Sequence, residues 1–548
     1  MSVFKVYDTT LRDGAQREGI SFSVGDKIQI VRLLDALGID YIEGGWPGSN
    51  PKDMEFFSRL KDIPFRHAKI TAFGSTRHAG AKVESDPNVM ALIEANTPVV
   101  TVVGKSWDFH VSHALGTTLE ENLAMIADTI FFLKARNLEV IFDAEHFFDG
   151  YINNPAYALE TIRAAVKSGA DSVVLCDTNG GTMPLDVRRI ILEVKKEFSV
   201  PLGIHAHNDC GMAMANSIIA LQSGATHVQG TINGYGERCG NADLCAVIAN
   251  MYFKLKIDKF KAEQLKELTR ISKVVAELAN MTPQDGQPYV GRNAFAHKGG
   301  IHVDAVVKHS QTYEHANPEE VGNKRRILIS ELSGKSNILF KVREKDIKLI
   351  KNYPEAIKVL DVLKKMEHEG YQFEGADGSF ELLIWKTLNT YKPLFKLESF
   401  RCILDKERRG SDWYIEATVK LRVGERIVHT AAEGNGPVNA MDNALRKALE
   451  EIYPEIRAIK LVDYKVRVLD GKDGTGAKVR VLITSQNSSK RWGTVGVSEN
   501  IIDASWAALV DSIEYGLLCN QNPPVDDIKN AINEITWEEE YIVNSHKR

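Results

Sequence analysis

Eight short runs of apolar and β-branched residues recur along the first half of the chain, and glycine, aspartate or proline bounds most of them. Helical patterns separate these runs. Alternating strands and helices are typical of a parallel sheet, and eight such units match a (β/α)8 TIM barrel. We therefore predict a TIM barrel over residues 1–275, with strands at 3–8, 41–45, 69–73, 99–103, 139–145, 172–178, 202–207 and 226–232.

The first connecting helix is well defined in the sequence. Ser23 is a candidate N-cap, and apolar residues follow at helical spacing until Gly38 ends the pattern. An open, doubly wound sheet is the alternative α/β architecture. Its G-x-G-x-x-G turn is missing after the first strand, where residues 12–14 are instead Arg-Asp-Gly.

Past the eighth predicted strand the pattern becomes helical. Residues 261–281 have the spacing of one charged amphipathic helix, and two further helical patterns lie between residues 335 and 391. We therefore predict helical connector subdomains over residues 276–394.

From residue 395 apolar and polar residues alternate as they do in strands, and glycine turns at 434–436 and 493–496 each precede a helical pattern. This arrangement predicts two units of paired strands followed by a helix, and hence a separate α+β domain over residues 395–548. The domain has few candidate catalytic residues, so regulation or dimerisation is its expected task.

Candidate metal ligands lie at the ends of predicted strands. His205 and His207 are two residues apart on one strand, so their imidazoles point to the same side. Exposed histidine pairs are common, but Asp13 follows the first strand, and all strands of a parallel barrel open onto one face. Together these residues can form a carboxylate and two-imidazole site for Mg2+, Mn2+ or Zn2+. In the glycine-rich loop 233–241, Asn241 is either a further ligand or the N-cap of the next helix.

Composition and charge exclude several classes of protein. The 548 residues are too many for one core, and a formal net charge of −5 lacks the basic footprint of a nucleic-acid-binding protein. No apolar run approaches the roughly 20 residues of a membrane span, and we expect no secretory leader. Six cysteines without a C-x-x-C pair indicate reduced thiols, so we expect a cytoplasmic enzyme.

Two segments resemble the signatures of a known enzyme family. Residues 11–16 and 202–215, in this order, are similar to the two signatures of the 2-isopropylmalate, homocitrate and citramalate synthase family. Residues 43–52 and 230–241 are most similar to its citramalate synthase branch. Where isopropylmalate synthases carry a tyrosine in the connector, residues 322–326 are Gly-Asn-Lys-Arg-Arg, which disfavours that branch.

The resemblance implies a metal-dependent Claisen condensation of acetyl-CoA with a small 2-keto acid. It implies that Arg12 stabilises the developing negative charge and that Gln16 and Thr178 bind the keto acid. Glu145 and His302 each match a residue proposed as the base, and His302 would be supplied across a homodimer. Arg12 could instead only brace the metal-binding carboxylate, Glu145 could be structural, and His302 could be an ordinary polar residue of the connector.

The resemblance favours pyruvate as the keto acid and isoleucine as a feedback amino acid that binds the C-terminal domain. An isopropylmalate synthase that uses 2-oxoisovalerate, or a homocitrate synthase that uses 2-oxoglutarate, are the alternatives within the family. A hydroxymethylglutaryl-CoA lyase-like enzyme and a non-catalytic amino-acid sensor are the alternatives from other classes. The long tail argues against the lyase, and the metal constellation argues against the sensor.

Overall fold

The computed structural model describes residues 4–61, 63–328, 353–388, 391–406, 413–469 and 476–520. The chain divides into two compact units, one made of residues 1–296 and 314–326, the other of residues 297–313 and 327–548. Within the described ranges, no helix has the length and apolar character needed to cross a membrane. The division at residues 275 and 394 stays a prediction.

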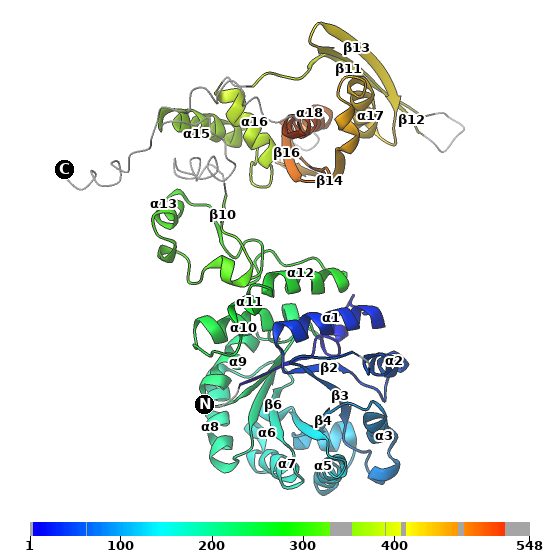
Figure 1. Ribbon diagram of the computed structural model, residues 1–548, viewed down its shortest axis with the longest axis vertical. Helices are drawn as coiled ribbons and strands as arrows, with labels where there is room; N and C mark the ends of the chain where they lie inside the picture. The colour runs from blue at the N-terminus through cyan, green and yellow to red at the C-terminus, as the bar shows by residue number, and fades with distance from the viewer. Residues whose placement is uncertain are drawn as a thin grey trace, which may run out of the picture. The chain divides into compact units, whose positions relative to one another are not determined.

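The first unit contains a closed barrel of eight parallel strands in sequence order, which β1 and β8 close by pairing with each other (Figure 1). This confirms the predicted TIM barrel, and the strands agree with the predicted runs to within two residues at the ends that the structure describes. The strands are β1 (Lys5–Asp8), β2 (Tyr41–Gly45), β3 (Lys69–Ser75), β4 (Val99–Lys105), β5 (Glu139–Glu145), β6 (Ser172–Asp177), β7 (Leu202–Ala206) and β8 (His227–Gly230).

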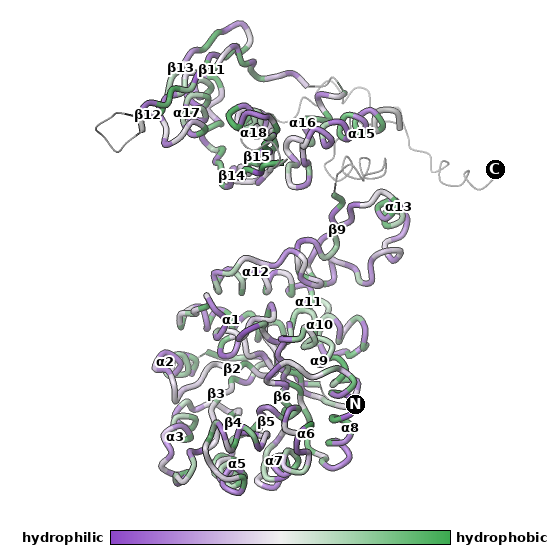
Figure 2. The backbone as a smooth tube through the Cα atoms, turned by 180° about the vertical axis from the view of Figure 1, so that it is seen from behind, coloured by the Kyte–Doolittle hydropathy of each residue, from purple (hydrophilic) through white to green (hydrophobic). Residues whose placement is uncertain are grey.

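Helices surround the barrel and bury one face against it, and Figure 2 shows hydrophobic and hydrophilic residues interleaved along them. The first, α1 (Val24–Leu37), begins at the predicted N-cap, where Ser23 and Asp26 form a capping box. It ends at Gly38, whose φ of 94° only glycine adopts readily. The other helices are α2 (Pro51–Leu60), α3 (Pro87–Glu94), α4 (Asp108–His110), α5 (Leu119–Lys134), α6 (Phe147–Asn153), α7 (Pro155–Lys167), α8 (Pro184–Glu197), α9 (Ala213–Gln222) and α10 (Leu244–Phe253).

The prediction of one continuous helix over residues 261–281 is wrong. The structure has two helices there, α11 (Ala262–Leu265) and α12 (Leu268–Leu278). Between them the backbone tightens, because the N–H of Glu267 donates to the carbonyl of Gln264, three residues back, at 3.1 Å. Apolar periodicity continues through such a tightened turn, so the sequence pattern does not reveal it.

The second unit carries two three-stranded antiparallel sheets, each followed by a helix. This confirms the predicted α+β domain, although each repeat has three strands where the sequence predicted two. The first repeat is β11 (Lys396–Lys406), β12 (Trp413–Val423), β13 (Arg426–Glu433) and α17 (Pro437–Leu449), and the second is β14 (Lys460–Val468), β15 (Val479–Gln486), β16 (Arg491–Ser498) and α18 (Ile501–Asn520). The unit also contains α13 (Gly300–Lys308), α15 (Tyr353–His368) and α16 (Asp377–Thr387).

The glycine turn predicted at 493–496 is wrong, because these residues lie inside strand β16. Their glycines serve close packing: a Cβ at Gly493 would overlap the carbonyl of Gly375, and one at Gly496 would overlap the carbonyl of Ala504 in α18. The turn at 434–436 does precede α17, as predicted. The two helical patterns predicted between residues 335 and 391 are confirmed by α15 and α16. Residues 329–352 and the tail beyond residue 520 lie outside the described residues.

Candidate active site

Three side chains predicted to bind metal meet at the carboxyl end of the barrel. Asp13 lies in the loop after β1, His205 in β7, and His207 directly after β7. Asp13 Oδ2 is 3.2 Å from His205 Nε2 and 3.9 Å from His207 Nε2, and the two Nε2 atoms are 3.3 Å apart. All three residues are buried, and their ligand atoms lie within 4.8 Å of one another. This is the carboxylate and two-imidazole arrangement that the sequence predicts.

The surroundings of Asp13 and His207 shift the pKa of each toward the protonation state that binds a metal ion. Burial alone would raise the pKa of Asp13, but the charge of Arg12 and the two histidines lower it well below its usual range, so the carboxylate is ionised. Burial, and then the neighbouring His205, lower the pKa of His207 to about 4. His207 is therefore neutral near pH 7 and keeps a nitrogen lone pair free for coordination.

Asn241 lies against this cluster and does not cap the following helix. Its Nδ2 is 3.1 Å from Asp13 Oδ2 and 3.2 Å from His205 Nε2. The helix-cap alternative is wrong, because the N-cap of α10 is Asp243, whose side chain accepts from the N–H of Cys245. Asn241 Oδ1 is buried and has no hydrogen-bond partner among the described residues. Exchanging the two ends of the amide would turn that oxygen toward the cluster, so the site fits a cation with Asn241 as a further ligand.

Arg12 is held in place by two neighbours that sequence reasoning did not assign to the site. Its Nε donates to the carboxylate of Glu43 in β2, and its guanidinium carbon lies 3.8 Å from the centre of the Phe73 ring. Its Nη2 is 3.7 Å from Asp13 Oδ2. Glu43 is buried and also accepts from Tyr7, so the guanidinium has a fixed orientation beside the candidate metal ligands.

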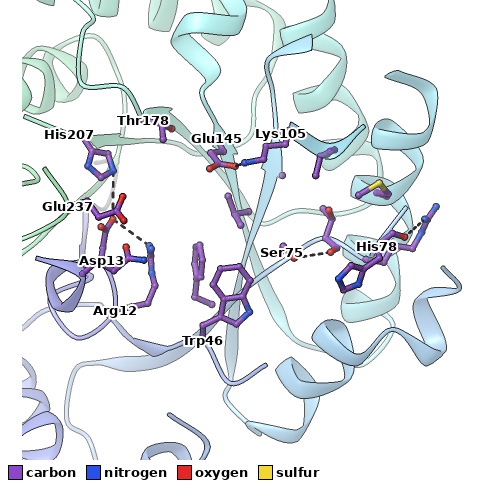
Figure 3. Close-up of a pocket in the computed structure, with 18 of the residues that line it drawn as sticks. Arg12, Asp13, Trp46, Ser75, His78, Lys105, Glu145, Thr178, His207 and Glu237 are labelled. Carbon is purple, nitrogen blue, oxygen red and sulfur yellow. Dashed lines mark hydrogen bonds and ion pairs between the residues drawn. The ribbon is translucent and has the colours of Figure 1, made fainter. Parts of the chain in front are cut away.

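A pocket of about 650 Å³ opens beside these residues. Figure 3 shows Arg12, Asp13 and His207 gathered together in it, with Glu145 and Lys105 nearby. His205 and Asn241 are buried and do not line it. Its lining combines charged groups with an apolar wall: Arg12, Asp13, Gln16, Trp46, Phe73, Ser75, Thr76, Arg77, His78, Ala79, Val103, Gly104, Lys105, Leu115, Met125, Glu145, Thr178, His207, Glu237 and Arg238.

Glu145 ends β5, and its carboxylate faces a lysine that the sequence did not reveal as its partner. Lys105 Nζ is 2.5 Å from Glu145 Oε2, because these residues stand opposite each other in the register of β4 and β5. Thr178, after β6, accepts from the N–H of His146 at 2.8 Å, which leaves its hydroxyl hydrogen available to a ligand.

Arg238, a lining residue that sequence reasoning also missed, ties together three loops at the mouth of the barrel. Its Nε and Nη2 donate to the two carboxylate oxygens of Asp209 at 2.7 and 2.9 Å, and Nη2 also donates to the carbonyl of Thr178 at 2.7 Å. Its φ of 54° lies in the left-handed region, so the surrounding contacts hold a strained backbone.

Models of known protein families match most of the chain. A model described as HMGL-like matches residues 3–275, one described as homocitrate synthase post-HMGL domain-like matches residues 289–370, and one described as LeuA allosteric (dimerisation) domain matches residues 374–517.

Curated relatives resemble the chain over nearly its whole length. An (R)-citramalate synthase of Geobacter sulfurreducens is 55% identical over 517 residues, which are 94% of this chain and 98% of that protein. Another, of Aquifex aeolicus, is 55% identical over 94% of this chain and 97% of that protein. The chain belongs to the (R)-citramalate synthase family. By contrast, a 2-isopropylmalate synthase of Methanocaldococcus jannaschii is 32% identical over 93% of each chain.

Membership of this family confirms the predicted enzyme class. The family consists of transferases that condense acetyl-CoA with a 2-keto acid, and HMGL-like enzymes are metal-dependent. The lyase alternative is therefore not favoured, and the sensor alternative is wrong. His302 lies on α13 of the second unit, where it is exposed and its ring stacks on Tyr313 at 4.1 Å. Its catalytic role stays a prediction.

Proposed function

We propose that the chain condenses acetyl-CoA with pyruvate to give (R)-citramalate and CoA, in isoleucine biosynthesis. The observation that carries the proposal is the buried cluster of Asp13, His205 and His207, with Arg12 beside it at a pocket. Pyruvate is preferred to 2-oxoisovalerate because identity reaches 55% with (R)-citramalate synthases and 32% with the 2-isopropylmalate synthase.

Asp13, His205 and His207 would hold a divalent cation, with Asn241 as a fourth protein ligand. A carboxylate with two imidazoles suits Mg2+ or Mn2+, and Zn2+ is the alternative. When bound, such a cation polarises the keto carbonyl as a Lewis acid. The chain's own residues supply the rest of the chemistry.

Arg12 and Thr178 orient the keto acid and stabilise charge. The Arg12 guanidinium, fixed by Glu43, places its donors beside the oxygen that becomes an alkoxide when the new carbon–carbon bond forms. The free hydroxyl hydrogen of Thr178 donates to the keto-acid carboxylate, and Gln16 lines the same pocket and offers an amide. These donors need no rearrangement during the reaction, which is how such sites lower barriers.

Glu145 is the candidate base within the barrel. Its carboxylate removes a proton from the methyl carbon of acetyl-CoA, and the resulting enolate attacks the keto carbon. The Lys105 ammonium, 2.5 Å from Glu145, stabilises the enolate charge. The alkoxide takes up one proton, which balances the proton that Glu145 removed, and water cleaves the thioester to release CoA. His302, supplied across a homodimer, is the second candidate for the base.

Replacing Asp13 tests the proposed metal site. Asp13→Ala removes the only carboxylate among the three predicted ligands, so we expect loss of Mn2+ binding in calorimetry together with loss of condensation. Asp258→Ala, at an exposed aspartate, is the matched control and should bind Mn2+ as the wild type does. Unchanged Mn2+ affinity in the folded Asp13→Ala chain would contradict the site.

We further propose that isoleucine is the feedback effector and that the enzyme is a cytoplasmic homodimer. The match of residues 374–517 to the LeuA allosteric (dimerisation) domain supports both the regulation and the dimer. All six cysteines are free, as expected in a reducing compartment.

A further inference from the structure

The interior of the barrel holds an unexpected row of hydrogen-bonded polar side chains beneath the candidate metal cluster. TIM-barrel interiors are usually filled by branched apolar side chains. Here Asp143 of β5 and Gln229 of β8 are buried, with exposed fractions of 3% and 0%. Gln229 stands opposite His205 in the register of β7 and β8, so their side chains lie next to each other inside the barrel.

Hydrogen bonds fix which atoms donate and which accept along this row of side chains. Gln229 Nε2 donates to Asp143 Oδ1 at 3.0 Å, which turns the amide oxygen toward His205. That oxygen is 2.7 Å from His205 Nδ1. Because an amide oxygen only accepts, Nδ1 must carry the hydrogen, and a neutral His205 then has its lone pair on Nε2, toward Asp13 and His207.

We propose that Gln229 is a positioning residue that holds His205 in the orientation and tautomer needed to bind a cation through Nε2. Asp143 acts one step further back, because it fixes which end of the Gln229 amide faces the imidazole. The inference rests on the proposed metal site and deepens it. Histidine ligands in proteins usually donate their other ring N–H to such a partner.

Of the two candidate histidine ligands, only His205 has such a hydrogen-bond partner on its Nδ1 among the described residues. His207 Nδ1 is buried and has no hydrogen-bond partner among the described residues, so the second imidazole lacks a comparable anchor. Water is also excluded around Gln229, whose exposed fraction is 0%, so solvent could not easily replace the amide oxygen. A single buried residue therefore decides which nitrogen of His205 faces the cation.

Gln229→Met removes the acceptor while keeping a side chain of similar length. We expect Mn2+ binding in calorimetry to weaken about 10–100-fold, the effect typical of a lost partner behind a metal-binding histidine. Saturating Mn2+ should restore most of the turnover, which a general structural defect would not allow. Gln29→Met, on the exposed face of α1, is the matched control and should change neither quantity. If Gln229→Met does not fold, Gln229→Asn replaces it in the experiment, because the shorter side chain moves the acceptor oxygen away from His205 by one methylene.

An exchange variant separates positioning from packing. In Gln229→Glu combined with Asp143→Asn, the net charge of the pair is unchanged, Glu at 229 accepts from His205 Nδ1, and the new amide at 143 donates to it. We expect Mn2+ affinity within about threefold of the wild type, because residues in direct contact are energetically coupled and the second change compensates the first. Gln229→Glu alone places two carboxylates side by side and should bind Mn2+ more weakly.

Wild-type affinity in Gln229→Met, or an exchange variant as weak as Gln229→Met, would overturn the positioning role. Neither result would affect the proposed condensation, which thiol release by the wild-type chain tests separately. A wild-type chain that binds no Mn2+ would overturn the metal site and the positioning role together.

Discussion

At the scale of single residues, the proposed chemistry depends on how firmly Arg12 is oriented. Its Nε donates to buried Glu43, its guanidinium carbon lies 3.8 Å from the centre of the Phe73 ring, and the residue lines the pocket. A lysine keeps the charge but has neither the planar fork nor the stacking face. The proposed charge-stabilising role of Arg12 thus depends on shape as well as on charge.

Arg12→Lys should therefore lower kcat by about 10–100-fold, since one or two preorganised donors are lost from the transition state. We expect the KM for pyruvate and the affinity for Mn2+ to change little. Steady-state kinetics and calorimetry measure these quantities, with Arg59→Lys on the exposed face of α2 as the control. A raised KM with unchanged kcat would show that Arg12 only binds substrate.

The sequence predicts the candidate metal ligands because the period of a strand and the common open face of a barrel place them together. Asp13, His205 and His207 follow from these two rules alone. Glu43 and Gln229 do not, because each lies inside a strand, before the strand end where the candidate ligands gather. Which residues meet inside the barrel depends on the register of neighbouring strands, and no single strand encodes that register.

At the scale of elements, Arg238 connects the loops that follow β6, β7 and β8. Through Asp209 and the carbonyl of Thr178 it holds the loop whose hydroxyl is proposed to bind the keto acid. The pair is partly exposed, with 43% of the Arg238 side chain accessible, so its contribution is modest.

Arg238→Met should raise the KM for pyruvate about fivefold, which corresponds to about 1 kcal/mol, and leave kcat nearly unchanged. The reason is that Thr178 keeps its hydroxyl, while its backbone carbonyl loses the hydrogen bond from Arg238 that holds the loop in position. Initial-rate kinetics decide the matter, with Arg189→Met on the outer surface of α8 as the control. A large fall in kcat at constant KM would mean that Arg238 takes part in the chemistry.

In the second unit, α18 is connected to the segment before β11 by Glu514, which accepts from the N–H of Leu394 at 3.1 Å and from Tyr391. Burial raises the pKa of Glu514 to about 7 from 4.5, against the opposing effects of Lys386 and the Leu394 amide. Between these two pH values the folded chain keeps a proton that the unfolded chain has released. The free energy of unfolding therefore falls as the pH rises through this range.

Glu514→Gln stays neutral and should remove this pH dependence. We expect the wild type to lose about 1–3 kcal/mol relative to the variant as the pH rises from about 5 to 8. Thermal unfolding across that range measures the difference, and Glu499→Gln, at an exposed glutamate, should follow the wild type. Parallel curves for wild type and Glu514→Gln would contradict the raised pKa.

The predicted elements were correct where periodicity is strong, as in α1 with its Ser23 cap, and wrong where a residue serves packing between elements. Gly493 and Gly496 look like turn residues in the sequence, yet they lie in a strand because Gly375 and Ala504 approach too closely for any side chain. Such contacts between distant segments leave no local trace in the pattern.

At the scale of the whole molecule, the C-terminal domain is best tested in the intact chain. Phe380 and Leu383 of α16 share a hydrophobic cluster with Val495 of β16, so a cut near residue 390 would strip α16 of its partner. We expect isoleucine to inhibit the full chain, with a coupling of about 1–3 kcal/mol, and leucine and lysine to have little effect. Initial rates with each amino acid, together with calorimetry, test this. If isoleucine, leucine and lysine neither change the rate nor bind in calorimetry, dimerisation remains as the domain's task.

The measurement that tests the central claim most directly is thiol release from acetyl-CoA by the intact, Mn2+-saturated chain, with pyruvate, 2-oxoisovalerate and 2-oxoglutarate compared in parallel. We expect kcat/KM to be at least about tenfold higher for pyruvate than for either larger keto acid, as one or two extra methyl or methylene groups commonly allow. Faster turnover of 2-oxoisovalerate, or no thiol release with any of the three, would contradict the proposed function.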